Sequence, residues 1–225
     1  WLGDGLSNGK GFSLNYDTDQ QTLQYWKDWA EKNNAVIRNN VHYSFTVYSK
    51  SNVEATHING VCNRVDDNPL KAVLRSYNLI GNKHIPSDFI VNDREIRLKV
   101  LAGLIDTDGS VLENSREIRI TQGPSNYRII EDVYKLSISL GFSCEIRNQC
   151  TDNKFSTYKE LIITGPSIHE IPTLLPRKQL VNKTQLQSGR SLMSSKFKLK
   201  NTGVGPYVGW QLEDKRGRFT LKDGL

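Results

Sequence analysis

The stretch Leu101–Gly109 reads LAGLIDTDG, an apolar segment that carries two small residues and ends in two acids, Asp106 and Asp108. Its apolar positions, together with those just before it, recur at the three- and four-residue spacing of a helix with one buried face. The pair Asn92-x-x-Glu95 predicts a capping box at the start, and Gly109 predicts the end. We therefore expect a helix of about three to four turns.

The two acids are unusual at this place. A carboxylate near the C-terminus of a helix faces the negative end of the helix dipole, which disfavours it by about 0.3–1 kcal/mol. A bound cation is the first candidate to offset that cost.

A shorter copy of the stretch opens the chain. WLGDG at residues 1–5 overlays IDTDG at residues 105–109, so that Asp4 matches Asp108 whereas Leu2 matches Asp106. If two equivalent sites exist, Asp4 and Asp108 carry them, and Asp106 is a helix-end or supporting group.

Similar segments follow both copies. Each copy precedes an extended stretch, a helical stretch of about 16 residues, a further extended region and a last apolar helical segment, which spans 68–81 in one half and 167–175 in the other. We interpret this order as helix–hairpin–helix–hairpin–helix, twice, in one α+β chain. Two more strands, Tyr207–Leu212 and Arg218–Leu221, are predicted after the second copy.

Composition narrows the class of protein. Charged residues make up 24% and hydrophobic residues 37%, which is ordinary for a soluble globular chain, and no apolar run approaches the roughly 20 residues of a membrane span. No signal peptide is recognised, and an odd number of cysteines (three) with four scattered histidines argues against a disulfide framework or a zinc site. We expect an intracellular protein.

Positive charge is concentrated near the end of the chain. Residues 173–225 hold 11 Lys and Arg against 3 Asp and Glu, whereas residues 1–172 hold 19 against 21. This asymmetry predicts an anionic partner, most simply nucleic acid; a solvated basic tail is the alternative.

LAGLIDTDG with its partner WLGDG resembles the signature of the LAGLIDADG homing endonucleases. Shorter pieces, among them VYSK, NPLKAV and KHIPSDF, resemble fungal inteins that carry such an endonuclease, of the type inserted in the yeast vacuolar ATPase subunit. GWQLEDKRGRFTLKDGL is similar to the last splicing block of inteins, with an unrelated β-hairpin as the alternative. The terminal His-Asn and the N-terminal splicing half are missing, so we expect no splicing.

The resemblance implies three regions: a first repeat at 1–99, a second repeat at 100–190, and a splicing-domain segment at 191–225. It also implies that the two signature helices pack side by side, with Ala102 and Gly103 at the contact, beneath a DNA-binding saddle of two four-stranded antiparallel sheets.

In that arrangement Asp4 and Asp108 come together and share a divalent cation. Oxygen ligands at two helix ends suit Mg²⁺, with Mn²⁺ as a substitute, and the carbonyls of Gly3 and Thr107 are the further ligands that the resemblance implies. The sequence DTDGS does not fit a calcium-binding EF-hand, because the other acidic ligands are not at the required offsets.

Two lysines are the candidates for charge stabilisation of the reaction. Lys83 follows Asp4 by 79 residues and Lys178 follows Asp108 by 70, and by resemblance each projects toward one scissile phosphate. Arg177 is the competing choice beside Lys178, and a surface lysine next to a proline-bounded loop is the alternative for either.

DNA contacts are expected from polar residues that alternate with apolar ones along the saddle strands, and from the basic C-terminal part. A solvated strand face is the alternative for each. The candidates are Arg38, Asn40, His42, Arg119, Arg147, Gln149, Lys154, Lys183 and Arg190.

These expectations combine into one predicted function. The chain is predicted to be a monomeric intein endonuclease that makes a Mg²⁺-dependent double-strand break at a long, asymmetric site in DNA, in the nucleus if the host is a fungus. The alternatives are a non-catalytic nucleic-acid-binding or RNA-splicing module, and a decayed intein endonuclease.

Overall fold

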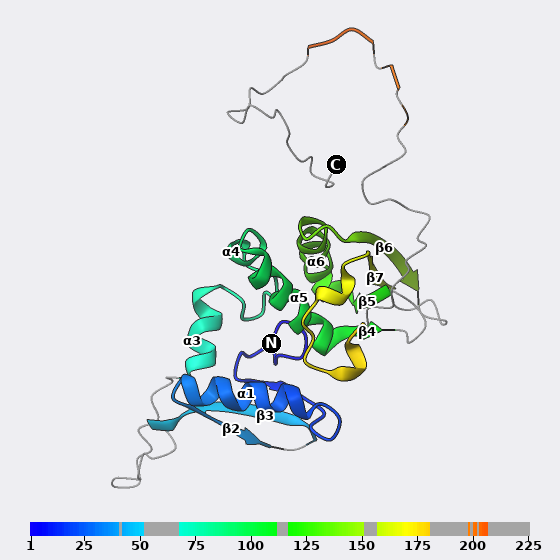
Figure 1. Ribbon diagram of the computed structural model, residues 1–225. Coiled ribbons are helices and arrows are strands. Elements are labelled where there is room, and N and C mark those ends of the chain that lie inside the picture. The colour runs from blue at the N-terminus through cyan, green and yellow to red at the C-terminus, as the bar shows by residue number, and fades with distance from the viewer. Residues whose placement is uncertain are drawn as a thin grey trace. The chain divides into compact units, whose positions relative to one another are not determined.

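The computed structural model describes residues 1–40, 42–51, 68–111, 117–150 and 157–180, and in the C-terminal part residues 198, 200, 201 and 203–206. The chain divides into two compact units, Trp1–Asn182 and Lys183–Leu225. All the helices and strands below belong to the first unit (Figure 1). The hairpin predicted after residue 206 lies outside the described residues.

The first sheet is antiparallel, with the order β1-β3-β2 (Gly11–Ser13, Ser44–Ser49 and Ala35–Asn39). Gly5 extends it by a single bridge to Phe12. The described residues thus form three strands where four were predicted. The reason is local: a tight turn, in which Gly9 N–H bonds to the carbonyl of Leu6 at 2.9 Å, begins directly after Gly5.

Helix α1 (Gln20–Lys32), as predicted, covers this sheet through an aromatic core. The ring of Phe12 stacks on Trp26 of α1 at 4.1 Å and on Phe45 of β3 at 5.3 Å. Helix α3 (Pro69–Ser76) adds Leu70 and Leu74 to the same core. Burial of these large side chains, worth roughly 1.5–3 kcal/mol each, holds the first half of the unit together.

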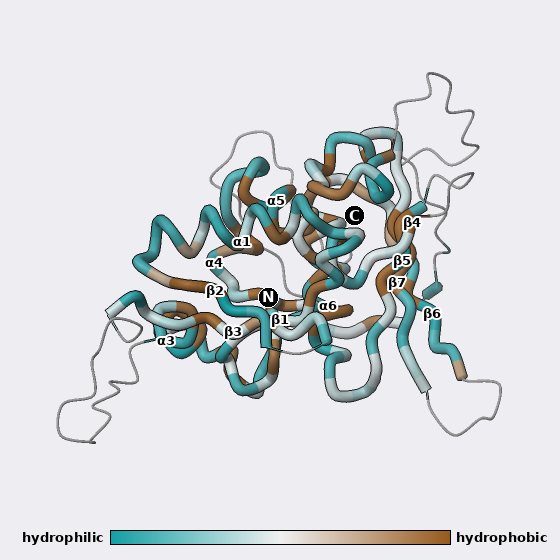
Figure 2. Tube along the Cα trace, turned by 90° about the horizontal axis from the view of Figure 1, so that it is seen from below, coloured by the Kyte–Doolittle hydropathy of each residue, from teal (hydrophilic) through white to brown (hydrophobic). Residues whose placement is uncertain are grey.

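The second sheet is antiparallel and four-stranded, in the order β4-β5-β7-β6 (Gly109–Val111, Glu117–Gln122, Thr157–Thr164 and Ser143–Cys150). The predicted helix α6 (Tyr127–Ser139) packs on it, and Figure 2 shows apolar residues along β5 and β7. The fully buried members of this core come from both layers: Ile118, Ile120, Leu161, Ile163, Ile130, Val133 and Leu136.

Helix α5 (Arg94–Asp108), preceded by the short α4 (Ser87–Ile90), contains the quoted stretch and has the predicted length. Its start differs from the prediction, because the N-cap residue is Asp93 and not Asn92. The side chain of Asn92 donates instead to the carbonyl of Asp88 at 3.1 Å. Ala102 is buried, whereas Gly103 is exposed and a Cβ there would meet no described atom within 4 Å. The contact between two signature helices stays a prediction, because the described residues contain one such helix.

The helix predicted over residues 167–175 is wrong. The chain forms only two 3-10 turns in this region, η2 (Ile168–Glu170) and η3 (Pro176–Lys178); a third, η1 (Pro124–Asn126), precedes α6. Pro172 disfavours helical geometry in the residue before it, and Ile171 is accordingly extended. Within the described part of the chain, no helix is long and apolar enough to cross a membrane.

Candidate active site

The first turn of the chain lies against the C-terminal end of α5. A Cβ atom on Gly3 would be 2.2 Å from Oγ1 of Thr107 and 2.8 Å from Oδ1 of Asp108, so only glycine allows this approach. The contact brings Asp4 near Asp108, and the charge of Asp108 helps to raise the pKa of Asp4. Two acids 104 residues apart in sequence therefore meet at one site.

Burial is the main cause that raises the pKa of both carboxyl groups. For Asp4 the neighbouring charge of Asp108 adds to this, while the two lysines act in the opposite direction. For Asp108 the side chain of Gln122, which donates from Nε2 to Oδ2, also opposes the effect of burial. The folded chain thus holds two half-buried acids that a cation would stabilise in their ionised form.

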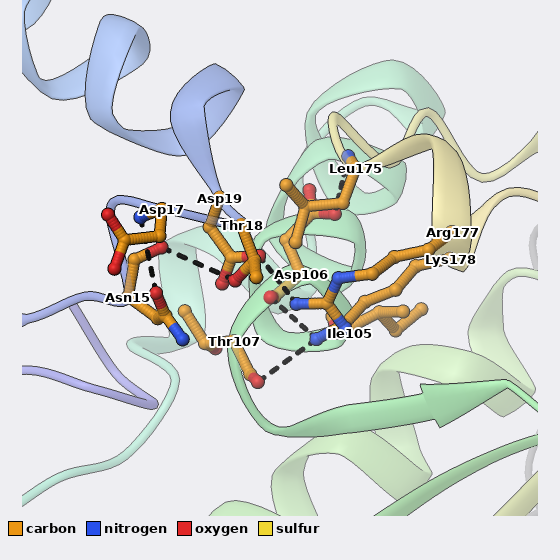
Figure 3. A network of polar contacts seen from close by, with 10 residues as sticks. All are labelled: Asn15, Asp17, Thr18, Asp19, Ile105, Asp106, Thr107, Leu175, Arg177 and Lys178. Atoms are coloured by element: carbon orange, nitrogen blue, oxygen red, sulfur yellow. Dashed lines mark hydrogen bonds and ion pairs between the residues drawn. The ribbon is translucent and has the colours of Figure 1, made fainter.

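Lys178, the last residue of η3, lies against the C-terminal end of α5 and is almost fully buried, with 5% of its surface exposed. Its Nζ donates to the carbonyls of Ile105 at 2.8 Å, Asp106 at 2.6 Å and Thr107 at 3.1 Å (Figure 3). The helix leaves the carbonyls of Asp106 and Thr107 unpaired, whereas that of Ile105 also accepts the N–H of Gly109. The ammonium group therefore caps α5 and neutralises the negative end of its dipole.

Lys83 takes a similar place beside the first turn of the chain. Its Nζ donates to the carbonyl of Gly3 at 2.6 Å and lies 5.2 Å from the centre of the Trp1 ring. Burial lowers the pKa of both lysines, and the charge of Asp108 raises that of Lys83 in part. Lys83 lowers the pKa of Asp108 more than Lys178 does. For Asp4 the order is reversed, and Lys178 has the larger effect on its pKa.

Arg177, the competing candidate, is paired with a different acid. Its Nη2 forms an ion pair of 2.6 Å with Oδ1 of Asp19, which precedes α1 (Figure 3). The structure therefore brings Lys178, and not its neighbour, to the end of the helix.

Asp106 has the supporting place predicted for it. It is 5% exposed, and its two oxygens accept the main-chain N–H groups of Leu174 at 2.8 Å and Leu175 at 3.1 Å. These two N–H donors stabilise the negative charge of Asp106 and so offset the unfavourable end of the helix dipole.

Sequence reasoning missed Gln122. Its amide donates to Asp108, and Asn126 Nδ2 in turn donates to Oε1 of Gln122 at 3.2 Å. The available signal was a long polar side chain at the end of a strand of alternating residues, close after the second signature.

The site suits a hard cation with few protein ligands. Among the described residues, no group of three or more His, Cys, Asp or Glu comes together as a metal site. Asp4 and Asp108 supply two carboxylates, which is the number that Mg²⁺ commonly uses together with water and phosphate oxygens. The carbonyls of Gly3 and Thr107, the other predicted ligands, each accept a hydrogen bond from a lysine Nζ.

The candidate DNA contacts divide into three groups: those of the first sheet, those of the second sheet and those outside the described residues. In the first sheet, Arg38 is exposed on β2 and lies over the ring of Tyr48, Asn40 donates to Thr46 Oγ1 at 2.6 Å, and His42 belongs to the β2–β3 turn with a φ of 49°. Lys154, Lys183 and Arg190 lie outside the described residues.

On the second sheet the candidates are held by acids of the same sheet. Arg119 pairs with Glu117 at 2.6 Å and with Glu160 at 3.7 Å, and Arg147 forms two bonds of 2.9 Å to Glu145. Gln149, on the same strand as Arg147, is partly exposed. The arginines are therefore oriented by carboxylates, and this face carries no excess of positive charge from these five residues.

In the comparison with protein families, the matching part of the chain contains the stretch LAGLIDTDG. Residues 95–173 match the LAGLIDADG-like domain, and this match supports a LAGLIDADG homing endonuclease family. The chain is also 28% identical over 128 residues to the replicative DNA helicase DnaB of Mycobacterium intracellulare, a match that covers 57% of this chain and 22% of the helicase. The chain thus spans about a fifth of the length of that relative.

Proposed function

We propose that this chain is an intein-derived homing endonuclease that makes a Mg²⁺-dependent, site-specific double-strand break in DNA at the intein insertion site. The observation that carries the proposal is the meeting of Asp4 and Asp108, one from each copy of the signature. Lys83 bonds to the residue before Asp4, and Lys178 to the residue before Asp108. The LAGLIDADG-like domain at 95–173, whose family acts on DNA, supports the reaction class.

The proposal assigns the acids to metal binding. Asp4 and Asp108 would hold the ion, joined by the main-chain carbonyls of Gly3 and Thr107. When bound, the ion would lower the pKa of a coordinated water and stabilise charge on the phosphate oxygens. Gln122 keeps the carboxylate of Asp108 oriented through its amide hydrogen bond.

The lysines supply positive charge to the scissile phosphates. Lys83 and Lys178 are held near the acid pair by burial and hydrogen bonding, so they need little reorganisation to stabilise a developing negative charge. Because two lysines flank two acids, we assign one lysine to each DNA strand.

Internal correspondence supports the two-repeat plan. Gly5 N–H bonds to the carbonyl of Trp1, and Gly109 N–H to that of Ile105, which is the pairing expected from the overlay of WLGDG on IDTDG. Gly5 then bridges to β1, as Gly109 in β4 pairs with β5. The order Gly5-β1-β3-β2 parallels β4-β5-β7-β6.

The partial match to a helicase supports a mobile module. The shared segment makes up only 22% of that protein, as expected for a unit that occurs inside larger proteins. We propose that the unit acts as a monomer on a long asymmetric site, because its two halves differ in sequence, and that it works in the nucleus if the host is a fungus.

The test is cleavage of a DNA library that includes the uninterrupted insertion site, with Mg²⁺ or Mn²⁺. We expect one class of sites to receive a double-strand break, and Asp108→Asn to abolish it. Absence of cleavage with either metal, or full cleavage by Asp108→Asn, would refute the mechanism.

A binding-only module is the second candidate. The observation that favours it is the engagement of both lysines with main-chain carbonyls, as in purely structural capping. This candidate requires specific DNA binding without cleavage in the same assay.

A further inference from the structure

Two buried carboxylates hold the loops that carry the two lysines. We define the Lys83 loop as residues 82–85 and the Lys178 loop as residues 173–178. Oδ2 of Asp132, on α6, accepts the main-chain N–H of Ile85 at 3.1 Å. Asp106, on α5, accepts those of Leu174 and Leu175. Each loop is therefore attached to a helix that is distant in sequence.

The anchored atoms are close to the lysines along the chain. Ile85 follows Lys83 by two residues, and Leu175 precedes Lys178 by three. Ile85 is itself 2% exposed and packs in the core of the second sheet. A shift of the anchored N–H groups in either loop would therefore displace the lysine of that loop.

Secondary contacts reinforce the same two attachments. Arg128 of α6 donates from Nη1 to Oδ1 of Asn82 at 3.2 Å, which ties down the start of the Lys83 loop. Arg177 ties the Lys178 loop to Asp19 beside α1 (Figure 3). These secondary contacts thus join each lysine loop to the other half of the unit.

Both carboxylates are nearly inaccessible, with exposures of 5% for Asp106 and 6% for Asp132. Desolvation of a carboxylate is costly, so a buried charge contributes little net stability, whereas its removal leaves the N–H groups that it accepted without a partner. The specific effect of these two carboxylates is on the position of the loops. Each loop lies outside regular helix or strand at its anchored residues, and the carboxylate fixes its place relative to the site.

We propose that Asp132 and Asp106 are positioning residues, Asp132 for Lys83 and Asp106 for Lys178, so that each carboxylate controls cleavage of one DNA strand. This inference rests on the proposed function for its strand assignment. Neither residue touches the reacting atoms. Their effect passes through the loops, and a displacement of about 1 Å is enough to cost on the order of 100-fold in rate.

The first measurement is amide hydrogen exchange, which does not require cleavage. Asp132→Leu removes the acceptor of Ile85 and should accelerate exchange in the Lys83 loop while leaving the Lys178 loop unchanged. Asp106→Leu should do the reverse. Unchanged exchange in the anchored loop, or equal acceleration in both loops, would overturn the positioning role.

The second measurement follows both strands of a doubly labelled duplex that carries the site cut by the wild-type protein. Lys83→Met identifies the strand that depends on Lys83. Asp132→Leu should slow that strand by about 10-fold or more and the other by less than about 2-fold. A partly unfolded variant would slow both strands equally, so equal slowing contradicts the inference even where the variant folds poorly.

Conservative variants separate the two carboxylates further. Asp132→Asn keeps one oxygen for the single N–H of Ile85, and we expect cleavage within about 3-fold of the wild type. Asp106→Asn offers one oxygen to two donors, so it should slow the Lys178-dependent strand by about 10-fold or more. In the Lys83→Met background, Asp132→Leu should produce no further slowing; a full additive effect would count against positioning.

The matched controls remove a carboxylate from the same helices at exposed places. Glu131→Gln, next to Asp132 on α6, and Glu95→Gln, at the other end of α5, have side chains that are 54% and 77% exposed. Both should leave the two strand rates and the exchange of the loops unchanged. A wild-type protein that cuts neither strand contradicts the proposed function, while hydrogen exchange still decides whether the carboxylates hold the loops.

Discussion

Gly3 packs directly against Thr107 at the end of α5, because a Cβ on Gly3 would lie 2.2 Å from Thr107 Oγ1. This approach brings the two candidate metal-binding acids together. The glycine of the signature helix itself, Gly103, lies in open space instead.

We therefore expect Gly3→Ala to separate the first turn of the chain from the C-terminal end of α5. Overpacking of this kind costs typically about 1–3 kcal/mol in the free energy of unfolding, and displacement of Asp4 should reduce cleavage in proportion to the loss of metal binding. Denaturant unfolding and metal titration measure the two effects. Gly103→Ala is the control, and in the helix interior it should be neutral or stabilising by about 0.5–1 kcal/mol. Equal effects of the two variants would contradict the close approach.

Replacement of either acid should uncouple stability from function. Asp4→Asn and Asp108→Asn each remove one of two neighbouring negative charges, so the metal-free protein should be at least as stable as the wild type. Cleavage should fall by on the order of 100-fold or more, since loss of even an outer partner of a metal ligand costs roughly 10–100-fold. Thermal unfolding with chelator and strand cleavage are the measurements; a strongly destabilised Asp108→Asn protein would argue against repulsion.

The same acids should make the stability of the metal-free protein depend on pH. The pKa values of Asp4 and Asp108 are raised above the usual 3.8, so the folded state binds more protons than the unfolded state between the unfolded and folded values. The contribution of these groups to stability is therefore unfavourable at neutral pH, and this cost is relieved as the pH falls through the folded pKa. The difference in stability between wild type and the Asp4→Asn, Asp108→Asn double variant, followed from pH about 7 to 4, should shift in favour of the wild type. The opposite slope would refute the assigned pKa directions.

The two lysines should differ in their importance for folding. Lys178 caps three carbonyls of α5 and is buried, so Lys178→Met leaves acceptors unpaired and should cost about 1.5–3 kcal/mol. Among the described residues Lys83 donates to a single carbonyl, that of Gly3, and its replacement by Met should cost less. Denaturant midpoints of the two variants test the order. Both should impair cleavage, each mainly on one strand, and a Lys178→Met protein with unaltered cleavage would remove it from the site.

The acids on the second sheet should limit non-specific DNA binding. Glu145 holds the guanidinium of Arg147 by two hydrogen bonds, so Glu145→Gln should release Arg147 for contact with a phosphate. We expect tighter binding to unrelated DNA and a slope of log affinity against log salt that is steeper by about 1. Fluorescence anisotropy over a salt series measures this. Glu31→Gln removes an exposed charge from α1 and serves as the control. An identical change in both variants would point to net charge alone.

Local patterns were sufficient for most of the secondary structure. Apolar periodicity predicted α1, α5 and α6, and alternation predicted the strands on either side, because both depend on residues only a few positions apart. The failures were also local in cause. Pro172 interrupts the predicted helix at 167–175, and Asp93 begins α5 in place of Asn92.

The chemistry of the site was only partly accessible in this way. The misfit of two acids at the end of a helix, and the overlay of Asp4 on Asp108, follow from the residues themselves and the direction of the helix dipole. Other features of the site depend on hydrogen bonds between residues 14 to 73 positions apart. They are the N–H groups of Leu174 and Leu175 on Asp106, the cap of α5 by Lys178, and the bond from Gln122 to Asp108. Tertiary packing decided these partners, because a buried charge is stabilised by whichever donors or acceptors the fold brings to it, and no short-range pattern identifies them.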